Sequence, residues 1–328
     1  MKIIPVPVRE DNYAYILIDQ PSNDAAIVDP FDVPKVTSVA DSLGVSVVAG
    51  ITTHHHHDHS GGNKVLMIEP TSWNPHLTVL RNLSVWPSVC RGRHLTQNCL
   101  TGRQIPRCPN IWRKPSNPSL NEISQRQRWV YSREKYVNQV SSLGFVPTCA
   151  DISPRWLATP CHTQDSICYY ATDIIDKSQP GVVFTGDTLF IAGCGRFFEG
   201  SAEEMDKALR YLGTLPDDTI VLNGHEYTAG NLGFAKSVDP DNMALQRLVE
   251  LVKQNNITTG LTSMKDEKEW NVFMRLTSDA VRLVPAITGT RFEFHVRCLV
   301  RKFTSASADT PLSQIMNSLR NKKNTFKG

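Results

Sequence analysis

The sequence predicts an α/β fold, in which a layered α/β domain is followed by a smaller helical domain. Short apolar runs rich in β-branched residues recur up to about residue 224, as strands of a packed sheet do. Beyond that point the strand pattern fades and helical periodicity replaces it. A chain of 328 residues is long enough for two domains. We place them at residues 1–230 and 231–328.

The predicted strands are short and bounded by Gly, Pro, Asp or Asn, which favour turns. Helical patterns separate some of them, which indicates alternating strands and helices in layers. The predicted strands are 2–8, 13–19, 25–30, 45–53, 155–160, 166–172, 181–187 and 219–224.

Helices are predicted where apolar residues recur every three to four positions. The first begins at Ser201, which precedes Glu204 by the spacing of a capping box. The last carries Leu312, Ile315 and Leu319 on one stripe. The predicted helices are 201–212, 242–255 and 310–323, the last capped by Thr310.

Two stretches interrupt this organisation. Residues 65–128 show no sustained period of 2 or 3.6 and are rich in Pro, Asn, Ser and Arg, so we expect an inserted, poorly ordered segment. Residues 283–300 are expected to be a smaller insertion in the helical domain. Genuine insertions and gene-model artefacts both remain open from the sequence.

Composition excludes several classes of function. A net charge of +3 is too small to favour nucleic acid as a partner. No apolar run approaches the roughly 20 residues that span a bilayer, and the N-terminus shows no secretory signal. The eight cysteines form no CxxC pair, which favours reduced thiols. We therefore expect a monomeric cytoplasmic protein, with a mitochondrial pool left open.

The stretch TTHHHHDHSGGN, residues 52–63, concentrates imidazole and carboxylate groups. His54 and His56 alternate, so in an extended segment they face the same way and reach one ion. Asp58 and His59 follow where the chain turns, and can face a second ion. A solvated loop or a tag-like tract is the alternative, but tags lie at chain ends and this run lies inside the chain.

Further metal ligands are expected at the ends of other strands. His162, Asp187 and His225 each follow a predicted strand, as the histidine run does. Groups at strand ends of an α/β sheet gather where the loops converge. Imidazole and carboxylate ligands without thiolate suit zinc, iron or manganese. Seven ligands divide over two ions, and such a pair makes water a nucleophile without help from a nucleophilic side chain.

These residues resemble the metallo-β-lactamase superfamily, whose hallmark is HxHxDH followed by a later His, Asp and His. Further segments resemble glyoxalase II, the hydroxyacylglutathione hydrolases, and the resemblance covers the chain except for the two interruptions. It implies an αββα sandwich followed by a helical C-terminal domain that binds substrate. The matching segments are LATPCHT (157–163), FTGDTLFIAGCGRFFEG (184–200), GHEYT (224–228), NVFMR (271–275) and LRNKKNTFK (319–327).

The resemblance also implies the roles of the ligands and the reaction. Two divalent ions, zinc first among zinc, iron and manganese, would hold a bridging hydroxide positioned by Asp58 and Asp187. That hydroxide would attack the thioester of S-lactoylglutathione, giving glutathione and D-lactate in the second step of methylglyoxal detoxification. The implied ligands are His54, His56 and His162 for one ion, Asp58, His59 and His225 for the other, and Asp187 between them.

Substrate contacts are implied at five positions. Arg196, Arg320 and Lys323 would meet the carboxylates of glutathione, and Tyr227 follows the last metal histidine. Phe198 stands where the family has a tyrosine, which removes a hydroxyl and can change the preferred thiol carrier. Without the resemblance, the run RNKK would be interpreted as a solvated helix end.

Two other interpretations remain open at this point. One is a persulfide dioxygenase of the same superfamily, which would keep a single iron and fewer ligands. The other is an inactive metal-binding form produced by the insertion.

His57 replaces a bulky aromatic of the family, and its place in the run is expected to point it away from His54 and His56.

Overall fold

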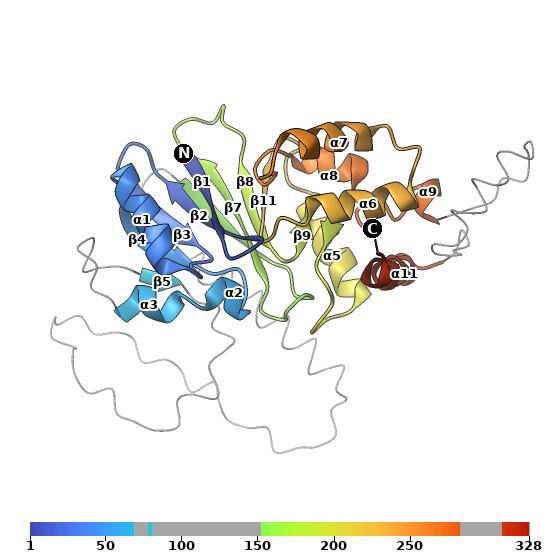
Figure 1. Ribbon diagram of the computed structural model, residues 1–328, viewed down its shortest axis with the longest axis horizontal. Helices are drawn as coiled ribbons and strands as arrows, with labels where there is room; N and C mark the ends of the chain where they lie inside the picture. The colour runs from blue at the N-terminus through green and yellow to red at the C-terminus, as the bar shows by residue number, and fades with distance from the viewer. Residues whose placement is uncertain (69–77, 81–151, 283–309, 328) are drawn as a thin grey trace, which may run out of the picture. The chain divides into compact units, whose positions relative to one another are not determined.

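Two β-sheets form the centre of the computed structural model, which describes residues 1–68, 78–80, 152–282 and 310–327 (Figure 1). The first sheet has the order β1-β2-β3-β4-β5 and the second β11-β8-β7-β6, with a small β9–β10 hairpin beside them. The strands are β1 (Lys2–Val8), β2 (Asn12–Ile18), β3 (Asp24–Val28), β4 (Ser46–Ile51), β5 (Thr78–Leu80), β6 (Ile152–Ala158), β7 (Ile167–Asp173), β8 (Val182–Gly186), β9 (Leu189–Phe190), β10 (Gly193–Cys194) and β11 (Ile220–Asn223).

Helices cover the outer faces of the two sheets (Figure 1). The described helices are α1 (Val33–Leu43), α2 (His57–Ser60), α3 (Asn63–Ile68), α5 (Ala202–Leu212), α6 (Thr228–Val238), α7 (Ala244–Gln254), α8 (Met264–Trp270), α9 (Asp279–Arg282) and α11 (Leu312–Thr325). Two of them, α1 and α3, pack against the first sheet, and a larger group lies against the second.

The layering follows from the alternation of side chains along the strands. Strand β2 is buried along its whole length. Its odd-numbered residues, such as Tyr15, join the core between the two sheets, whereas its even-numbered residues, such as Ile16, join the core under α1. A third core lies between the second sheet and the helices α5, α6, α7, α8 and α11. Helix, sheet, sheet and helix therefore stack as the predicted αββα sandwich.

Most predicted elements are confirmed by the structure. All eight predicted strands are present, and Ser201 and Glu204 form the expected capping box of α5. The prediction of Thr310 as an N-cap is wrong, because Pro311 occupies that position. The carbonyl of Pro311 accepts hydrogen bonds from the amides of Gln314 and Ile315, so the helix begins one residue later.

The segment 65–128 differs in part from its predicted lack of structure. Helix α3 reaches residue 68, and β5 pairs in parallel with the edge of β4. A strand of three residues is too short to show periodicity, so it could not be predicted from the sequence pattern. Residues 69–77 and 81–128 of this segment, and all of 283–300, lie outside the described residues.

Helix α8 carries a fully buried carboxylate, Glu267. Its oxygens accept hydrogen bonds from the indole N–H of Trp270, the amide group of Asn271 and the backbone N–H of Ala192. Burial raises the pKa of Glu267 from 4.5 to about 7, although these donors oppose the rise. The carboxyl group therefore keeps its proton in the folded chain at pH values where the unfolded chain has lost it.

Replacing Glu267 by glutamine should remove this part of the pH dependence of stability. Because the folded pKa is raised, the contribution is present below pH 4.5 and is lost as the pH rises to about 7. The loss amounts to about 3 kcal/mol. The free energy of unfolding should be measured with denaturant at about pH 5 and about pH 8 for both proteins. The wild-type value minus the variant value should be larger at the lower pH. A difference that is constant, or that grows with pH, contradicts this assignment.

Candidate metal centre

Four loops that follow strands converge at one edge of the sandwich. His54 follows β4, His162 follows β6, Asp187 follows β8 and His225 follows β11. Within the second sheet β8 and β11 are parallel, and β6 runs the same way because both β6 and β8 are antiparallel to β7. The ends of these strands therefore lie at one edge, as the sequence predicted.

The histidine run is shaped by its packing against the end of β3. Asp29 accepts hydrogen bonds from the backbone N–H and the hydroxyl of Thr53, at 2.7 and 2.8 Å. The chain then turns into α2, with His56 as its N-cap and Asp58 and His59 inside it. At Gly62 a Cβ atom would lie 1.6 Å from the carbonyl oxygen of Pro30, so this close approach requires glycine.

One group of three imidazoles closes on the first side of the cluster. Nδ1 of His56 lies 3.1 Å from Nε2 of His54 and 3.0 Å from Nε2 of His162. Two nitrogen ligands of a tetrahedral zinc ion, each at about 2.0–2.1 Å from the metal, would be about 3.3 Å apart. The three nitrogens are thus spaced nearly as ligands of one ion.

A second group, Asp58, His59 and His225, closes on the other side. Nε2 of His59 lies 3.2 Å from Nε2 of His225. An Oδ2 atom of Asp58 is 3.6 Å from the same nitrogen of His225. Asp187 lies between the groups, because its Oδ1 is 3.3 Å from Nε2 of His59 and its Oδ2 is 3.4 Å from Nε2 of His162.

Oxygen acceptors on the outer side fix the tautomer of three histidines. Nδ1 of His162 donates to the carbonyl oxygen of Arg196 at 3.0 Å. Nδ1 of His59 donates to Asp29 at 2.9 Å, and Nδ1 of His225 donates to Asp11 at 3.0 Å. In the neutral rings each inner Nε2 then carries a lone pair. Such outer partners are typical of metal-ligating histidines.

Protonation of the cluster follows from burial and from Asp187. Burial lowers the pKa of His54 well below its usual value, which keeps this imidazole neutral. Burial alone would also lower the pKa of His59, but the carboxylates of Asp187 and Asp29 outweigh it and raise the pKa well above its usual value. Protons therefore compete with a cation at His59 as the pH falls.

The residues present fit divalent cations. The buried Oδ1 atom of Asp187 accepts no regular hydrogen bond, although Nε2 of His59 lies 3.3 Å away, so a positive charge beside it would lower the cost of its burial. The described residues form three groups of possible ligands, and within each group the ligand atoms lie within 4.8 Å of one another. All of these atoms are imidazole nitrogens or carboxylate oxygens. Nitrogen and oxygen donors without thiolate suit zinc, iron and manganese.

Three residues that orient the ligands were not predicted from the sequence. Asp29 and Asp11 hold the rings of His59 and His225, and Asn12 donates to Oδ2 of Asp58 at 2.9 Å. All three lie in the segments DNY and VDP near the N-terminus. A polar residue directly beside a buried strand was the available signal, but nothing in the sequence names its partner.

The other two histidines of the run lie outside the three ligand groups. His57 is exposed and packs edge-on against the ring of Phe31, with 5.5 Å between centroids. It points away from the cluster, as expected. His55 makes a 2.8 Å contact with Asp165, which ties the histidine run to the loop that carries His162.

A groove of about 770 Å³ adjoins the cluster and contains three of the five residues expected to bind substrate, namely Arg196, Phe198 and Arg320. The exposed ring of Phe198 lies edge-on to His56 and tilted against His162, with centroids 5.8 and 5.1 Å away. The groove therefore begins at the cluster and runs along α11.

The other two expected substrate residues do not line this groove. Tyr227 stacks on His225, with 4.7 Å between ring centroids, and burial raises the pKa of its hydroxyl to about 12. Lys323 donates to the carbonyl oxygen of Gly230 at 2.7 Å. Burial lowers the pKa of Lys323 to about 8, so this ammonium is not an ordinary solvated charge.

Arg320 is 7% exposed, which excludes its interpretation as part of a solvated helix end. Its guanidinium group donates to the carbonyl oxygen of Cys194 at 2.9 Å and to Asn324 at 2.9 Å. It also lies over the ring of Phe273, 5.6 Å from the centroid. Arg320 therefore fastens α11 to the hairpin beside the cluster.

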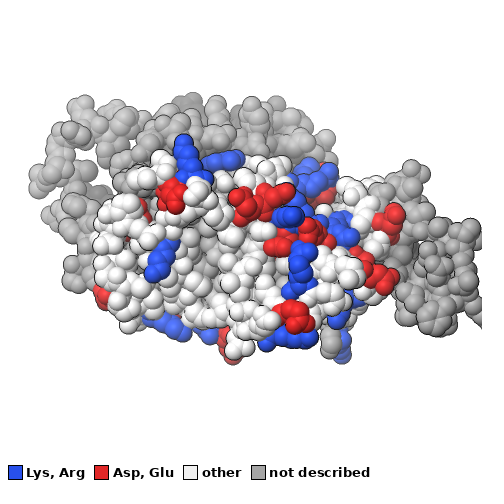
Figure 2. All heavy atoms as spheres, turned by 90° about the horizontal axis from the view of Figure 1, so that it is seen from above, with Lys and Arg blue, Asp and Glu red and all other residues white. Residues whose placement is uncertain are grey.

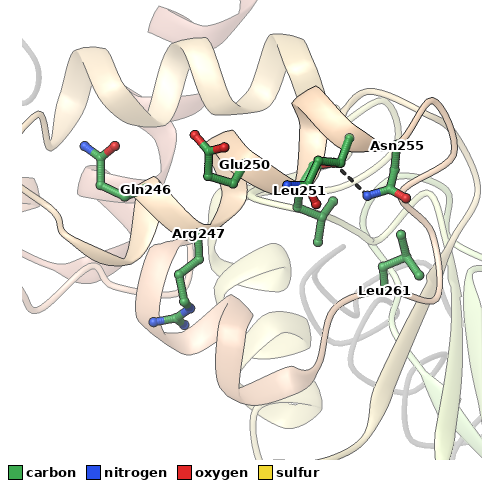
Figure 3. Close-up of a pocket in the computed structure, with 7 residues that line it drawn as sticks. Gln246, Arg247, Glu250, Leu251, Asn255 and Leu261 are labelled. Carbon is green, nitrogen blue, oxygen red and sulfur yellow. Dashed lines mark hydrogen bonds between the residues drawn. The ribbon is translucent and has the colours of Figure 1, made fainter.

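A second groove, of about 690 Å³, lies along α7 (Figure 3). No metal-centre residue lines it. The side chains that Figure 3 labels are Gln246, Arg247, Glu250, Leu251, Asn255 and Leu261.

Surface charge does not concentrate in a single-sign patch on the face drawn in Figure 2, where basic and acidic side chains of the described residues are interspersed. Elsewhere in the described residues, Arg247 pairs with both Asp266 and Glu269. None of the helices in the described ranges is long and apolar enough to cross a membrane.

Gly224 provides a direct test of the cluster. A Cβ atom there would lie 2.5 Å from Oδ1 of Asp187 and 2.9 Å from Cε1 of His59, so Gly224→Ala should displace both ligands. We expect metal content, measured by elemental analysis after gel filtration, to fall by half or more, about the loss of one ion. Gly230→Ala is the matched control, because nothing lies within 4 Å of its added Cβ. Full metal content in Gly224→Ala would contradict the assignment.

Family models match both halves of the chain. The C-terminal model of hydroxyacylglutathione hydrolase matches residues 226–326. The model of the metallo-beta-lactamase superfamily matches residues 107–225, which includes His162, Asp187 and His225 but not the histidine run. The two matches meet directly after His225.

Relatives align over most of the chain. A hydroxyacylglutathione hydrolase of Arabidopsis thaliana, named as cytoplasmic, is 34% identical and covers 86% of this chain and 91% of its own. A probable hydroxyacylglutathione hydrolase of Schizosaccharomyces pombe is 35% identical, with coverage of 84% and 88%. A hydroxyacylglutathione hydrolase of Synechococcus is 30% identical, with coverage of 86% and 92%.

Similarity to solved structures is weaker. ETHE1 from Myxococcus xanthus aligns with 98% of this chain and 97% of its own at 19% identity, with a TM-score of 0.44. A similarity of this degree does not distinguish one activity from another. Because the family models match in both halves and the relatives align at 30–35% identity, the chain belongs to the hydroxyacylglutathione hydrolase, or glyoxalase II, family of the metallo-β-lactamase superfamily.

Proposed function

We propose that the protein hydrolyses the thioester bond of S-lactoylglutathione and related acylglutathiones, which releases glutathione and D-lactate. The observation that carries this proposal is the two-sided cluster, in which Asp187 lies between two groups of nitrogen and oxygen ligands. The hydroxyacylglutathione hydrolase names of the relatives supply the substrate class. This activity is the second step of methylglyoxal detoxification.

His54, His56 and His162 would hold one divalent ion, and Asp58, His59 and His225 the other, with Asp187 shared. When bound, such ions make water nucleophilic near neutral pH and polarise a carbonyl oxygen. The protein's own contribution is to orient the ligands. Asp11, Asp29 and the carbonyl of Arg196 hold three outer imidazole protons, so the inner nitrogens stay available as ligands.

The groove beside the cluster suits the peptide part of an acylglutathione. Arg196 is exposed at its edge and can meet a substrate carboxylate, since a guanidinium pairs well with that group. Phe198 covers His56 and His162 with an apolar ring, which keeps bulk water away from the reacting carbonyl. Phe198 brings no hydroxyl, so the peptide meets one hydrogen-bonding group fewer than a tyrosine would give.

Tyr227, Arg320 and Lys323 are also proposed to serve the substrate. Tyr227 lies on the other side of the cluster, against His225, where its hydroxyl can donate to a bound thioester. Arg320 and Lys323 are held by backbone carbonyls, so their charges are fixed in place before the substrate arrives. Fixed charges lower the ordering cost of binding an anion.

Further parts of the proposal concern the ions and the state of the protein. We propose zinc in both positions and a monomer in the cytoplasm, with domains at residues 1–230 and 231–328 and insertions at 65–128 and 283–300. A persulfide dioxygenase activity is not favoured, because the aligned relatives carry the hydrolase name. An inactive metal-binding form is not favoured either, since all seven ligands converge.

A steady-state assay with S-lactoylglutathione, run beside metal analysis of the same preparation, tests the proposal. We expect thioester hydrolysis that disappears when a chelator removes the metal and returns when zinc is added. Asp187→Asn should lower kcat by a factor of about a hundred or more, because it weakens the shared ligand. Metal-loaded protein that leaves the thioester intact would overturn the proposed activity.

Arg196 should contribute to substrate binding rather than to the chemical step. A hydrogen bond to a charged group contributes about 1.5–3 kcal/mol, so Arg196→Ala should raise KM roughly tenfold or more with little change in kcat. The variant should also lose part of the salt dependence of kcat/KM. Lys236→Ala removes an exposed positive charge from α6 and serves as the control. An unchanged KM in Arg196→Ala would rule out this contact.

A further inference from the structure

A buried hairpin connects two residues that contact the cluster. Thr188–Gly195 leaves Asp187, forms β9 and β10, and arrives at Arg196, whose carbonyl holds His162. The amide of Gly195 donates to the carbonyl of Thr188 at 3.3 Å, which closes the base of the hairpin. A Cβ atom at Gly195 would lie 1.9 Å from the carbonyl oxygen of Asp187. The shape of this hairpin therefore sets the distance between Asp187 and the carbonyl group of Arg196, which accepts the hydrogen bond from His162.

The tip of the hairpin has an unusual backbone. Ala192 has a φ of +54°, in the left-handed region that residues with a Cβ atom rarely adopt. A residue held there persists only when its surroundings fix it, and such positions cluster at functional sites. The fixing contact is the backbone N–H of Ala192, which donates to Oε2 of Glu267 at 2.9 Å.

Most side chains that hold this hairpin among the described residues come from the helical part of the chain, including Asn231, which donates to the carbonyl of Ile191 at 3.0 Å. Thr185 of β8 contributes as well, through a 2.7 Å hydrogen bond to the carbonyl of Leu189. The amide group of Asn271 donates to the carbonyl of Gly193 at 3.0 Å and to Oε2 of Glu267 at 2.8 Å. Arg320 donates to the carbonyl of Cys194. Glu267 and Asn271 are both 0% exposed, so neither side chain is solvated by water at the surface.

Burying a carboxylate is expensive, and an apolar side chain would fill the same space at lower cost. Glu267 nevertheless accepts three hydrogen bonds and is linked to both sides of the hairpin tip, directly at Ala192 and through Asn271 at Gly193. An acceptor here also satisfies the buried N–H groups of Ala192, Trp270 and Asn271, which an apolar side chain would leave unpaired. The same contacts control the geometry of the hairpin, which leads to Asp187 on one side and to Arg196 on the other.

We propose that Glu267 is a positioning residue for the metal centre, acting with Asn271 through the turn at Ala192 on Asp187 and on the carbonyl of Arg196. The helical part then sets the geometry of the ligands in addition to lining the groove. This inference rests on the metal-binding part of the proposed function and is independent of the thioester substrate. No contact between Glu267 and a substrate is required.

Cobalt provides the test, since the visible absorption of protein-bound Co²⁺ reports the geometry of its ligands. The measurements are the Co²⁺ spectrum, the zinc dissociation constant from competition with a chelator, and thermal unfolding of the full chain. We expect Glu267→Gln to change the spectrum and to weaken zinc binding about tenfold or more, as loss of an outer support of a metal site does. Glu267→Asp, which keeps the carboxyl group but shortens the side chain, should show a smaller change and replaces the glutamine variant if that variant does not fold.

Two comparisons separate positioning from general destabilisation. Ser263→Ala removes the N-cap of the same helix without touching the hairpin, and should lower the unfolding temperature while leaving spectrum and zinc affinity unchanged. Ala192→Gly, added to Glu267→Gln, should restore part of the zinc affinity, because glycine adopts the left-handed turn without strain.

A Glu267→Gln protein with the wild-type spectrum and zinc affinity would overturn the inference, even if it unfolds earlier. Loss of zinc affinity in Ser263→Ala to the same degree would overturn it too. Neither readout involves S-lactoylglutathione, so a failure of the proposed thioesterase activity would be recognised separately.

Discussion

The metal centre depends on the position of three imidazole protons. His59, His162 and His225 direct their Nδ1 protons outward, to Asp29, to the carbonyl of Arg196 and to Asp11. In the neutral rings the inner nitrogens are then acceptors that face one another at little more than 3 Å, around a carboxylate oxygen that accepts no regular hydrogen bond. Lone pairs that face one another in a buried space repel, which is unfavourable unless a positive charge lies among the ligands. The surrounding oxygens therefore favour the binding of cations at this centre.

The rest of the fold can be understood from the need to bring these outer acceptors into place. The carbonyl of Arg196 ends the hairpin that starts at Asp187, and helices from the second half of the chain fix that hairpin. Asp29 directly follows β3 and Asp11 directly precedes β2 in the first sheet. The ligands come from four strand ends, but their orientation comes from residues spread over both halves. Division into a catalytic and a substrate-binding part is thus incomplete as a description of how the centre is built.

The sequence was most informative where a local pattern implies a local structure. The turn in the histidine run, the capping box at Ser201 and the apolar run of β2 each depend on neighbouring residues, and the structure agrees with each. It was least informative where partners are distant. Nothing in the sequence pairs Asp11 with His225 or Glu267 with Ala192, and the burial of Arg320 in a run of polar residues could not be seen. The short strand β5 lies below the length at which periodicity can be recognised.

X-ray absorption spectroscopy of the zinc-loaded protein tests the central claim most directly. The buried thiols of Cys161 and Cys194 lie close to the ligand loops in sequence, yet neither belongs to a ligand group. We expect a first shell of nitrogen and oxygen at about 2.0–2.2 Å with imidazole scattering and no sulfur. Because Asp187 would be shared, a second zinc should scatter at about 3.5–4 Å. A sulfur shell at about 2.3 Å, or zinc bound without imidazole, would contradict the assignment of the cluster.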